Sequence, residues 1–176
     1  MERLRWLRLG GTAIKELPSS TIHLKKVWTV SFKGCQLLSS SLTSMPIYFS
    51  IDLSDCNLSA IPSGIDRSSI YKLFLSGNDF ISLPESISQF SRLSQLYFDG
   101  CKSLRSLSNI PSKISFICVD NCSSLEKLPE PPNDFCWSSF RNFTVQCFNC
   151  FKLASNSQNF SNMFQVSLSL ISVCVF

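Results

Sequence analysis

The chain has 176 residues, enough for one modest domain or a short array of repeats. Hydrophobic residues make up 44% of it and its mean hydropathy is +0.15, which is high for a fully solvated globule. The net charge of +4 is spread along the chain without a run of Lys and Arg, which argues against a nucleic-acid-binding protein.

Residues 1–6, M-E-R-L-R-W, lack the basic and then apolar stretch of a secretion signal. They begin directly inside the first repeat of the array described below. No polar-faced capping repeat precedes it, although the ends of solenoids need such caps to stay soluble. We therefore expect either a piece of a longer protein or a gene model that starts late.

Residues 70–84 read I-Y-K-L-F-L-S-G-N-D-F-I-S-L-P and define the repeat frame of the chain. Apolar residues alternate only across residues 73–75, and a turn sequence ending in Asn78 follows. Neither an amphipathic helix nor a long strand has this pattern. It matches the leucine-rich repeat pattern L-x-x-L-x-L-x-x-N/C-x-L.

The same frame recurs five more times along the chain. Its ninth positions, at successive spacings of 23, 21, 22, 23 and 21 residues, are Thr12, Cys35, Cys56, Asn78, Cys101 and Cys122. These spacings fall within the 20–29 residues typical of the repeat. The first, fourth and sixth positions are all apolar or aromatic: Leu4, Leu7, Leu9; Val27, Val30, Phe32; Tyr48, Ile51, Leu53; Ile70, Leu73, Leu75; Leu93, Leu96, Phe98; Ile114, Ile117, Val119.

This pattern predicts an α/β solenoid, a horseshoe segment of about six leucine-rich repeats with a short parallel sheet on its concave face. An irregular, aromatic-rich C-terminal extension is expected to follow. A Leu-Pro or Ile-Pro pair comes after most ninth positions, and proline ends a strand because it fixes φ and lacks a donor. The pairs are Leu17-Pro18, Ile61-Pro62, Leu83-Pro84 and Leu128-Pro129. The about five to nine residues left between repeats allow one short turn of α- or 3₁₀-helix.

Four of the nine cysteines stand at ninth positions of the repeat. We expect their side chains to point inward and to satisfy the turn backbone, because Cys behaves as a small buried hydrophobe with a weak donor. Without a secretion signal we expect free thiols, although distance does not exclude disulfides between neighbouring repeats.

The predicted array covers residues 1–130 and ends at the sequence E-P-P-N. Residues 131–163 are rich in aromatic residues and lose the period, which predicts an incomplete post-repeat domain that caps the last repeat. Residues 164–176 form an apolar tail with loose alternation. The tail is shorter than the about 20 residues that cross a bilayer. A strand is favoured, and a missing continuation or a spurious read-through is the alternative.

No group of residues in the sequence predicts catalysis or metal binding. A G-x-x-x-x-G-K-[ST] loop and a G-x-S-x-G elbow are both missing. His23, the single histidine, is expected to be an exposed loop residue. Cys147 and Cys150 form a lone C-x-x-C to which Cys136 and Cys174 add no matching pair, so packing is favoured over zinc. We predict no enzymatic activity, no metal and no cofactor.

The third and fifth positions of each repeat face away from the predicted core, and Trp28, Phe49 and Tyr71 stand at the adjacent second positions. A row of exposed aromatic side chains is costly without a partner, and aromatic and Arg side chains are typical of binding hot spots. The alternative is lateral packing of these side chains between neighbouring repeats. We favour a partner-binding concave face formed by Trp6, Arg8, Trp28, Phe49, Asp52, Tyr71, Lys72, Phe74, Tyr97 and Phe116.

Several phrases of the chain resemble the leucine-rich repeat part of plant intracellular immune receptors of the TIR-NBS-LRR type. This class carries an N-terminal Toll/interleukin-receptor-like domain and a nucleotide-binding domain. The phrases are L-x-L-G-G-T-A-I-K-E-L-P-S-S (7–20), L-S-x-C-N-L (53–58), L-F-L-S-G-N-D-F-I-S-L-P-E-S-I (73–87), L-Y-F-D-G-C-K-S-L-R-S-L (96–107) and D-N-C-S-S-L-E-K-L-P (120–129). In addition, F-N-C-F-K-L (148–153) resembles the motif that opens the post-repeat domain of this family.

The resemblance implies a protein–protein recognition module in a cytoplasmic or nuclear receptor involved in disease resistance. Its partners would be a pathogen effector or a guarded host protein, and the nucleotide-binding domain of the same receptor, which the repeats restrain. Neither nucleic acid binding nor a membrane span is expected.

The alternative is an extracellular receptor-like repeat protein that binds a ligand or co-receptor. Its glycosylation sequons would be Asn57, Asn121, Asn142 and Asn159. The L-x-G-x-I-P phrase that such proteins carry in a longer, very regular repeat does not occur in this chain.

Overall fold

The computed structural model describes residues 4–14, 23, 26–36, 49–108, 110, 111, 113–128, 144–155, 171 and 172. Some sequence-based predictions lie outside these residues: Leu17-Pro18, Tyr48, Pro129, Cys136, Asn142, Asn159, Cys174 and the predicted borders at residues 130 and 163.

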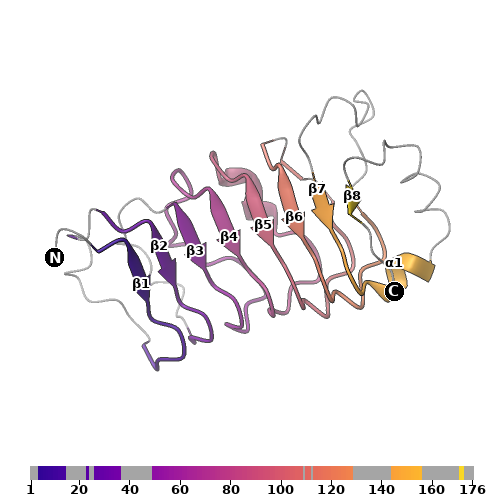
Figure 1. Ribbon diagram of the computed structural model, residues 1–176, viewed down its shortest axis with the longest axis horizontal. Helices are drawn as coiled ribbons and strands as arrows, with labels where there is room; N and C mark the ends of the chain where they lie inside the picture. The colour runs from indigo at the N-terminus through magenta and orange to yellow at the C-terminus, as the bar shows by residue number, and fades with distance from the viewer. Residues whose placement is uncertain are drawn as a thin grey trace.

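Each predicted repeat contributes one three-residue strand, and the strands lie side by side in chain order (Figure 1). All neighbouring pairs are parallel, which requires the chain to return to the same edge between strands. The strands are β1 Trp6–Arg8, β2 Thr29–Ser31, β3 Ser50–Asp52, β4 Lys72–Phe74, β5 Gln95–Tyr97, β6 Phe116–Cys118, β7 Thr144–Gln146 and β8 Ile171–Ser172. The predicted leucine-rich repeat solenoid is confirmed.

The register of the sheet keeps equivalent positions of neighbouring repeats together. The fourth positions form one row, in which Leu7 pairs with Val30 at one end and Leu96 with Ile117 further along. In repeats 2 to 6, no described residue at a first, fourth or sixth position is more than 2% exposed. In repeat 1, Leu4 is 37% exposed, because among the described residues β1 has a neighbouring strand on one side only. Neighbouring repeats therefore complete one another's core.

The sheet contains one more repeat than the sequence period predicted. Strand β7 lies within residues 131–163, the segment expected to be irregular, and pairs in parallel with β6. Val145 and Cys147 take the fourth and sixth positions of this seventh repeat and are 2% and 1% exposed. In the register, 28 residues separate Ile117 from Val145, against 21 to 23 in the earlier steps. The longer step conceals the repeat in the sequence.

Two short elements complete the described residues of the C-terminal part. Helix α1 (Phe151–Ser155) follows β7 and buries Leu153. Strand β8, the described part of the apolar tail, pairs in parallel with β7.

The turn after every strand of repeats 1 to 7 uses a left-handed backbone at the eighth position. The residues there have φ between 56° and 72° and are Gly11, Gly34, Asp55, Gly77, Gly100, Asn121 and Asn149. Gly, Asn and Asp tolerate this region best. The eighth position is therefore restricted by backbone geometry, a rule that the sequence-based repeat frame did not include.

The connecting side of the solenoid is built from short pieces. After Leu83-Pro84, the 3₁₀-helix η2 (Glu85–Gln89) packs Ile87 into the core, as the spacing predicted for this repeat. Single-residue parallel bridges join Ser82 to Ser106 and Ser106 to Lys127.

Candidate functional site: the strand face

The ninth-position side chains join neighbouring repeats and hold the strands that carry the site. In repeats 2 to 7 each donates a hydrogen bond to the sixth-position carbonyl of the preceding repeat, with donor–acceptor distances of 2.9 to 3.4 Å. The donors are Cys35, Cys56, Asn78, Cys101, Cys122 and Cys150. In repeat 1, Thr12 Oγ1 instead donates to Leu9 O of its own repeat. The predicted inward orientation of the ninth-position cysteines is confirmed.

Burial raises the pKa of the thiols of Cys56, Cys101, Cys122 and Cys150, so these side chains stay protonated. Desolvation raises the pKa of Cys101 to about 11 from an ordinary value of 9.0, although the backbone amides of Asn78 and Gly77 oppose the shift. Desolvation also raises the pKa of Cys147 to about 12. Thiols of this kind are weak nucleophiles, because the thiolate is the reactive form.

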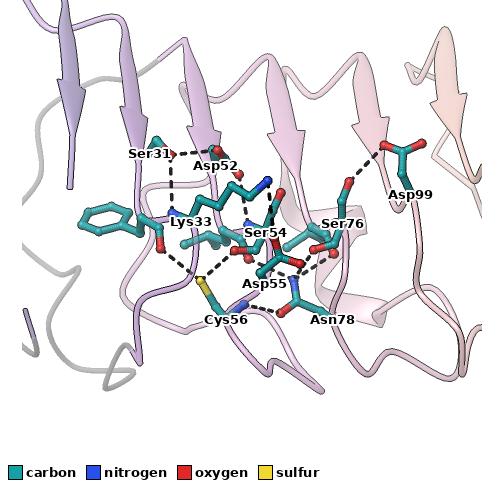
Figure 2. A network of polar contacts seen from close by, with 12 residues as sticks. Ser31, Lys33, Asp52, Ser54, Asp55, Cys56, Ser76, Asn78 and Asp99 are labelled. Atoms are coloured by element: carbon teal, nitrogen blue, oxygen red, sulfur yellow. Dashed lines mark hydrogen bonds and ion pairs between the residues drawn. The ribbon is translucent and has the colours of Figure 1, made fainter. Parts of the chain in front are cut away.

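Asn78 forms the densest of these contacts (Figure 2). Its Oδ1 accepts hydrogen bonds from Cys56 N at 3.0 Å and Leu58 N at 2.9 Å. Its Nδ2 donates to Leu53 O at 2.9 Å and Leu75 O at 2.8 Å. A carboxamide carries both donors and acceptors, whereas a thiol offers one weak donor. Asn78 therefore satisfies backbone groups of two repeats at once.

The structure places all ten predicted partner-binding residues on or beside the strands of one face, which we call the strand face. Their exposure falls into two groups. Trp6, Arg8, Trp28 and Phe49 are exposed, and Trp6 reaches 63%. The other six are partly buried: Asp52, Tyr71, Lys72, Phe74, Tyr97 and Phe116.

Aromatic rings of the strand face pack against one another across neighbouring strands. Phe74 and Tyr97 are stacked with ring centroids 4.3 Å apart, and Phe116 lies 5.4 Å from Tyr97 in a tilted arrangement. Phe49 and Tyr71 form a second stacked pair at 4.8 Å. Lateral packing thus orders these rings, and each still keeps part of its surface in solvent. Rings fixed in this way can meet a partner with little further loss of side-chain entropy.

Carboxylates of the strand face are engaged by neighbouring groups. Asp52 accepts hydrogen bonds from Ser31 Oγ at 2.8 Å and Ser54 N at 3.0 Å (Figure 2). Ser76 Oγ donates in the same way to Asp99 at 3.0 Å. Asp52 therefore supports the sheet as well as lining the face, a role that the sequence did not indicate.

Asp99, Cys118 and Asp120 form a group with metal-ligating chemistry, since their ligand atoms lie within 4.8 Å of one another. Internal contacts occupy the group: Cys118 Sγ donates to Asp99 at 2.6 Å, and Asp120 accepts from Phe148 N at 2.8 Å and from Gln146 Nε2. The recurrence of Asp at the seventh position of repeats 5 and 6 was the only signal for this group in the sequence. Its contacts join repeats 5, 6 and 7.

The two residues of the C-x-x-C motif belong to the seventh repeat. Cys147 fills the core, and Cys150 Sγ donates to Val119 O at 3.0 Å.

Arg5 is a strand-face residue that the sequence analysis missed. Its guanidinium lies 4.9 Å from the centre of the Trp28 ring, and the shared second position of the two repeats was the available signal.

The repeated strand, left-handed turn and ninth-position hydrogen bonds define a leucine-rich repeat protein. No protein-family model matches the chain.

Plant disease resistance proteins are similar to most of it. Disease resistance-like protein DSC1 of Arabidopsis thaliana is 31% identical over 90% of this chain, and probable disease resistance protein RPP1 of the same plant is 33% identical over 87%. TMV resistance protein N of Nicotiana glutinosa is 32% identical over 68%.

These similarities confirm the resemblance to the repeat region of plant TIR-NBS-LRR disease resistance proteins. The chain spans only 14%, 10% and 11% of the lengths of these three relatives. Within the described residues, no helix has the length and apolar character needed to cross a membrane.

Proposed function

We propose that this chain is a protein-recognition module of a plant intracellular immune receptor and that its strand face contacts the partner. The observation that carries the proposal is the ordered row of aromatic rings from Phe74 to Phe116 on the face opposite the core. Similarity to plant disease resistance proteins supports an immune role for the receptor. The module acts by binding and has no enzymatic activity of its own.

The partners we propose are a pathogen effector or a guarded host protein and, in the whole receptor, the nucleotide-binding domain. The same face would restrain that domain at rest and exchange it for the effector, so the two partners would compete. The receptor would act in the cytoplasm or the nucleus. Half-buried stacked rings suit such exchange, because they offer apolar area without needing a partner to remain folded.

The test replaces the central pair of rings, Phe74→Ala with Tyr97→Ala, in the tagged chain expressed in plant leaf cells. Partner capture should be abolished while the circular dichroism spectrum stays unchanged, because the core residues beneath are not altered. Phe151→Ala is the matched control, since Phe151 is an aromatic residue of α1 that is 60% exposed. An unchanged set of captured proteins in the double variant would refute the strand-face proposal.

The same experiment separates the proposed function from the extracellular alternative. A captured effector, or the nucleotide-binding domain of a resistance protein, that is lost in the double variant supports the proposed function. Glycans at the exposed Asn57 or Asn121 of chain isolated from plant cells would favour the extracellular alternative instead.

A further inference from the structure

Charge is distributed unevenly along the described part of the solenoid. The described residues of repeats 1 and 2 include the basic side chains of Arg5, Arg8, Lys26 and Lys33 and no acidic side chain. Lys33 forms an ion pair with Asp55 of repeat 3 at 3.4 Å. Arg8 is exposed and forms no ion pair with any described residue. Within the described part of the chain its positive charge is therefore not neutralised by an acidic side chain.

Apolar surface is exposed at the same end of the sheet. Trp6, Trp28 and Phe49 are 63%, 56% and 46% exposed, and they come from three successive repeats. Trp6 of β1 pairs in register with Thr29, the first residue of β2, so Trp28 directly precedes the strand that neighbours Trp6. Arg5, Trp6, Arg8, Trp28 and Phe49 together form what we call the basic aromatic patch.

The Arg5–Trp28 contact gives this patch a defined geometry. With its guanidinium 4.9 Å from the ring centre, Arg5 is in the range of a cation–π interaction. A guanidinium held over a ring keeps its N–H donors at the edges free for a carboxylate, which it can bind in a bidentate manner. The patch thus offers two guanidinium groups beside exposed indole rings.

We propose that the basic aromatic patch binds an acidic protein segment that carries an aromatic or long apolar side chain. Carboxylates of the segment pair with Arg5 and Arg8, and its apolar side chain packs on Trp6 and Trp28. This inference deepens the proposed function, because it assigns a chemical class of partner to one end of the strand face.

The other end of the face argues against nucleic acid as the ligand. Asp99 after β5 and Asp120 after β6 carry carboxylates there. Asp52 on β3 lies beside the patch, in the same repeat as Phe49, and its carboxylate accepts hydrogen bonds from Ser31 Oγ and Ser54 N. Nucleic acid binding needs cations that follow the phosphate backbone, and these carboxylates would repel it. A short acidic segment of a protein can instead confine its charges to repeats 1 and 2. The acidic part of the partner therefore lies at the β1 end of the sheet.

The test uses the full 176-residue chain and three labelled probes in fluorescence anisotropy. The probes are a short Glu-rich peptide with two Phe residues, the same peptide with Lys in place of Glu, and an oligothymidine. The acidic probe should bind saturably, and its binding should weaken several-fold between ~50 and ~300 mM salt as screening increases. The basic probe should not bind.

Two variants and one control locate the binding. Arg8→Glu and Trp28→Ala should each weaken binding of the acidic probe by about tenfold, since one reverses a charge and the other removes a hot-spot type of side chain. Lys102→Glu makes the same change of net charge at an exposed residue after the turn of repeat 5 and should leave binding unchanged. Arg8 and Trp28 are both exposed, and circular dichroism checks that the variants fold.

Each other outcome overturns the inference. These outcomes are no saturable binding of the acidic probe, equal binding of the basic probe, tighter binding of oligothymidine, or an Arg8→Glu variant that binds as the wild type does. The result is independent of the wider proposal, because Phe74→Ala with Tyr97→Ala should leave binding of the acidic probe intact. If only the anisotropy assay gives an overturning result, the acidic partner is rejected. If only the capture experiment does, because the double variant captures the same proteins as the wild type, the central rings are rejected as the immune contact.

Discussion

Replacing Asn78 by Ala should destabilise the solenoid more than any comparable change at an exposed site. The side chain is 2% exposed and makes four hydrogen bonds of 3.0 Å or less to backbone groups of repeats 3 and 4. Each such bond contributes about 1 kcal/mol net, so the variant should lose about 4 kcal/mol of unfolding free energy. Asn78→Cys should lose about 2 kcal/mol, because its sulfur can still donate to a backbone carbonyl, as Cys101 does at 3.4 Å.

Urea unfolding followed by circular dichroism and tryptophan fluorescence measures these differences. Trp28 lies two repeats before Asn78. If the repeats unfold cooperatively, the unfolding midpoints from circular dichroism and from tryptophan fluorescence must therefore shift together. Asp79→Ala is the matched control, since Asp79 is the exposed next residue, and it should change stability by less than about 0.5 kcal/mol. Equal unfolding midpoints for Asn78→Ala and Asp79→Ala would show that the four hydrogen bonds do not stabilise the fold.

Three further changes test other parts of the structure. Gly77→Ala should destabilise slightly more than Gly100→Ala in urea. Both have φ near +67°, but a Cβ at Gly77 would lie 1.9 Å from Asp55 Oδ1 and displace this exposed carboxylate from its ion pair with Lys33, whereas nothing lies within 4 Å at Gly100. Equal costs would mean that only backbone strain matters. Val145→Asp buries an unpaired charge in β7, so it should lower the free energy of unfolding by more than about 3 kcal/mol and make repeat 6 sensitive to protease. A protease digest like that of the wild type would show that the seventh repeat is not an integral part of the array. Because the pKa of Cys101 is higher in the folded chain than its ordinary 9.0, unfolding free energy should fall between about pH 9 and pH 11, and Cys101→Ala should flatten that slope. An equal slope in the variant would contradict the raised pKa.

Much of the fold follows from the sequence because a stacked repeat imposes strong local rules. The apolar first, fourth and sixth positions predicted the core from Val27 to Val119, and the spacing predicted parallel strands in register. The seventh repeat escaped detection because its step is longer and its sixth position is Cys147. The eighth and ninth positions, Asn149 and Cys150, were the signal that could have found it, since Asn121 and Cys122 occupy the same positions one repeat earlier.

The site was less predictable than the fold. The alternation of a strand shows that Phe74 and Tyr97 point away from the core, but it does not show whether rings on neighbouring strands stack or stand apart. That depends on the register and on side-chain rotamers, which bring these two rings to 4.3 Å. The contact between Arg5 and Trp28 has the same origin, because it joins residues of two repeats that are 23 positions apart.

In repeats 2 to 7 each ninth-position side chain donates a hydrogen bond to the preceding repeat, so every repeat depends on its neighbour for this contact. If the seventh repeat detaches, Val119 O loses its partner, the Cys150 thiol, and must be hydrated instead. If the first repeat detaches, the equivalent bond from the Cys35 thiol to Leu9 O is lost, but less apolar burial is lost, because Leu4 of repeat 1 is already 37% exposed whereas Val145 of repeat 7 is 2% exposed. Tension applied to both ends should therefore release repeats from the N-terminal end first, next to the basic aromatic patch. A partner bound to that patch would brace the weaker end of the array.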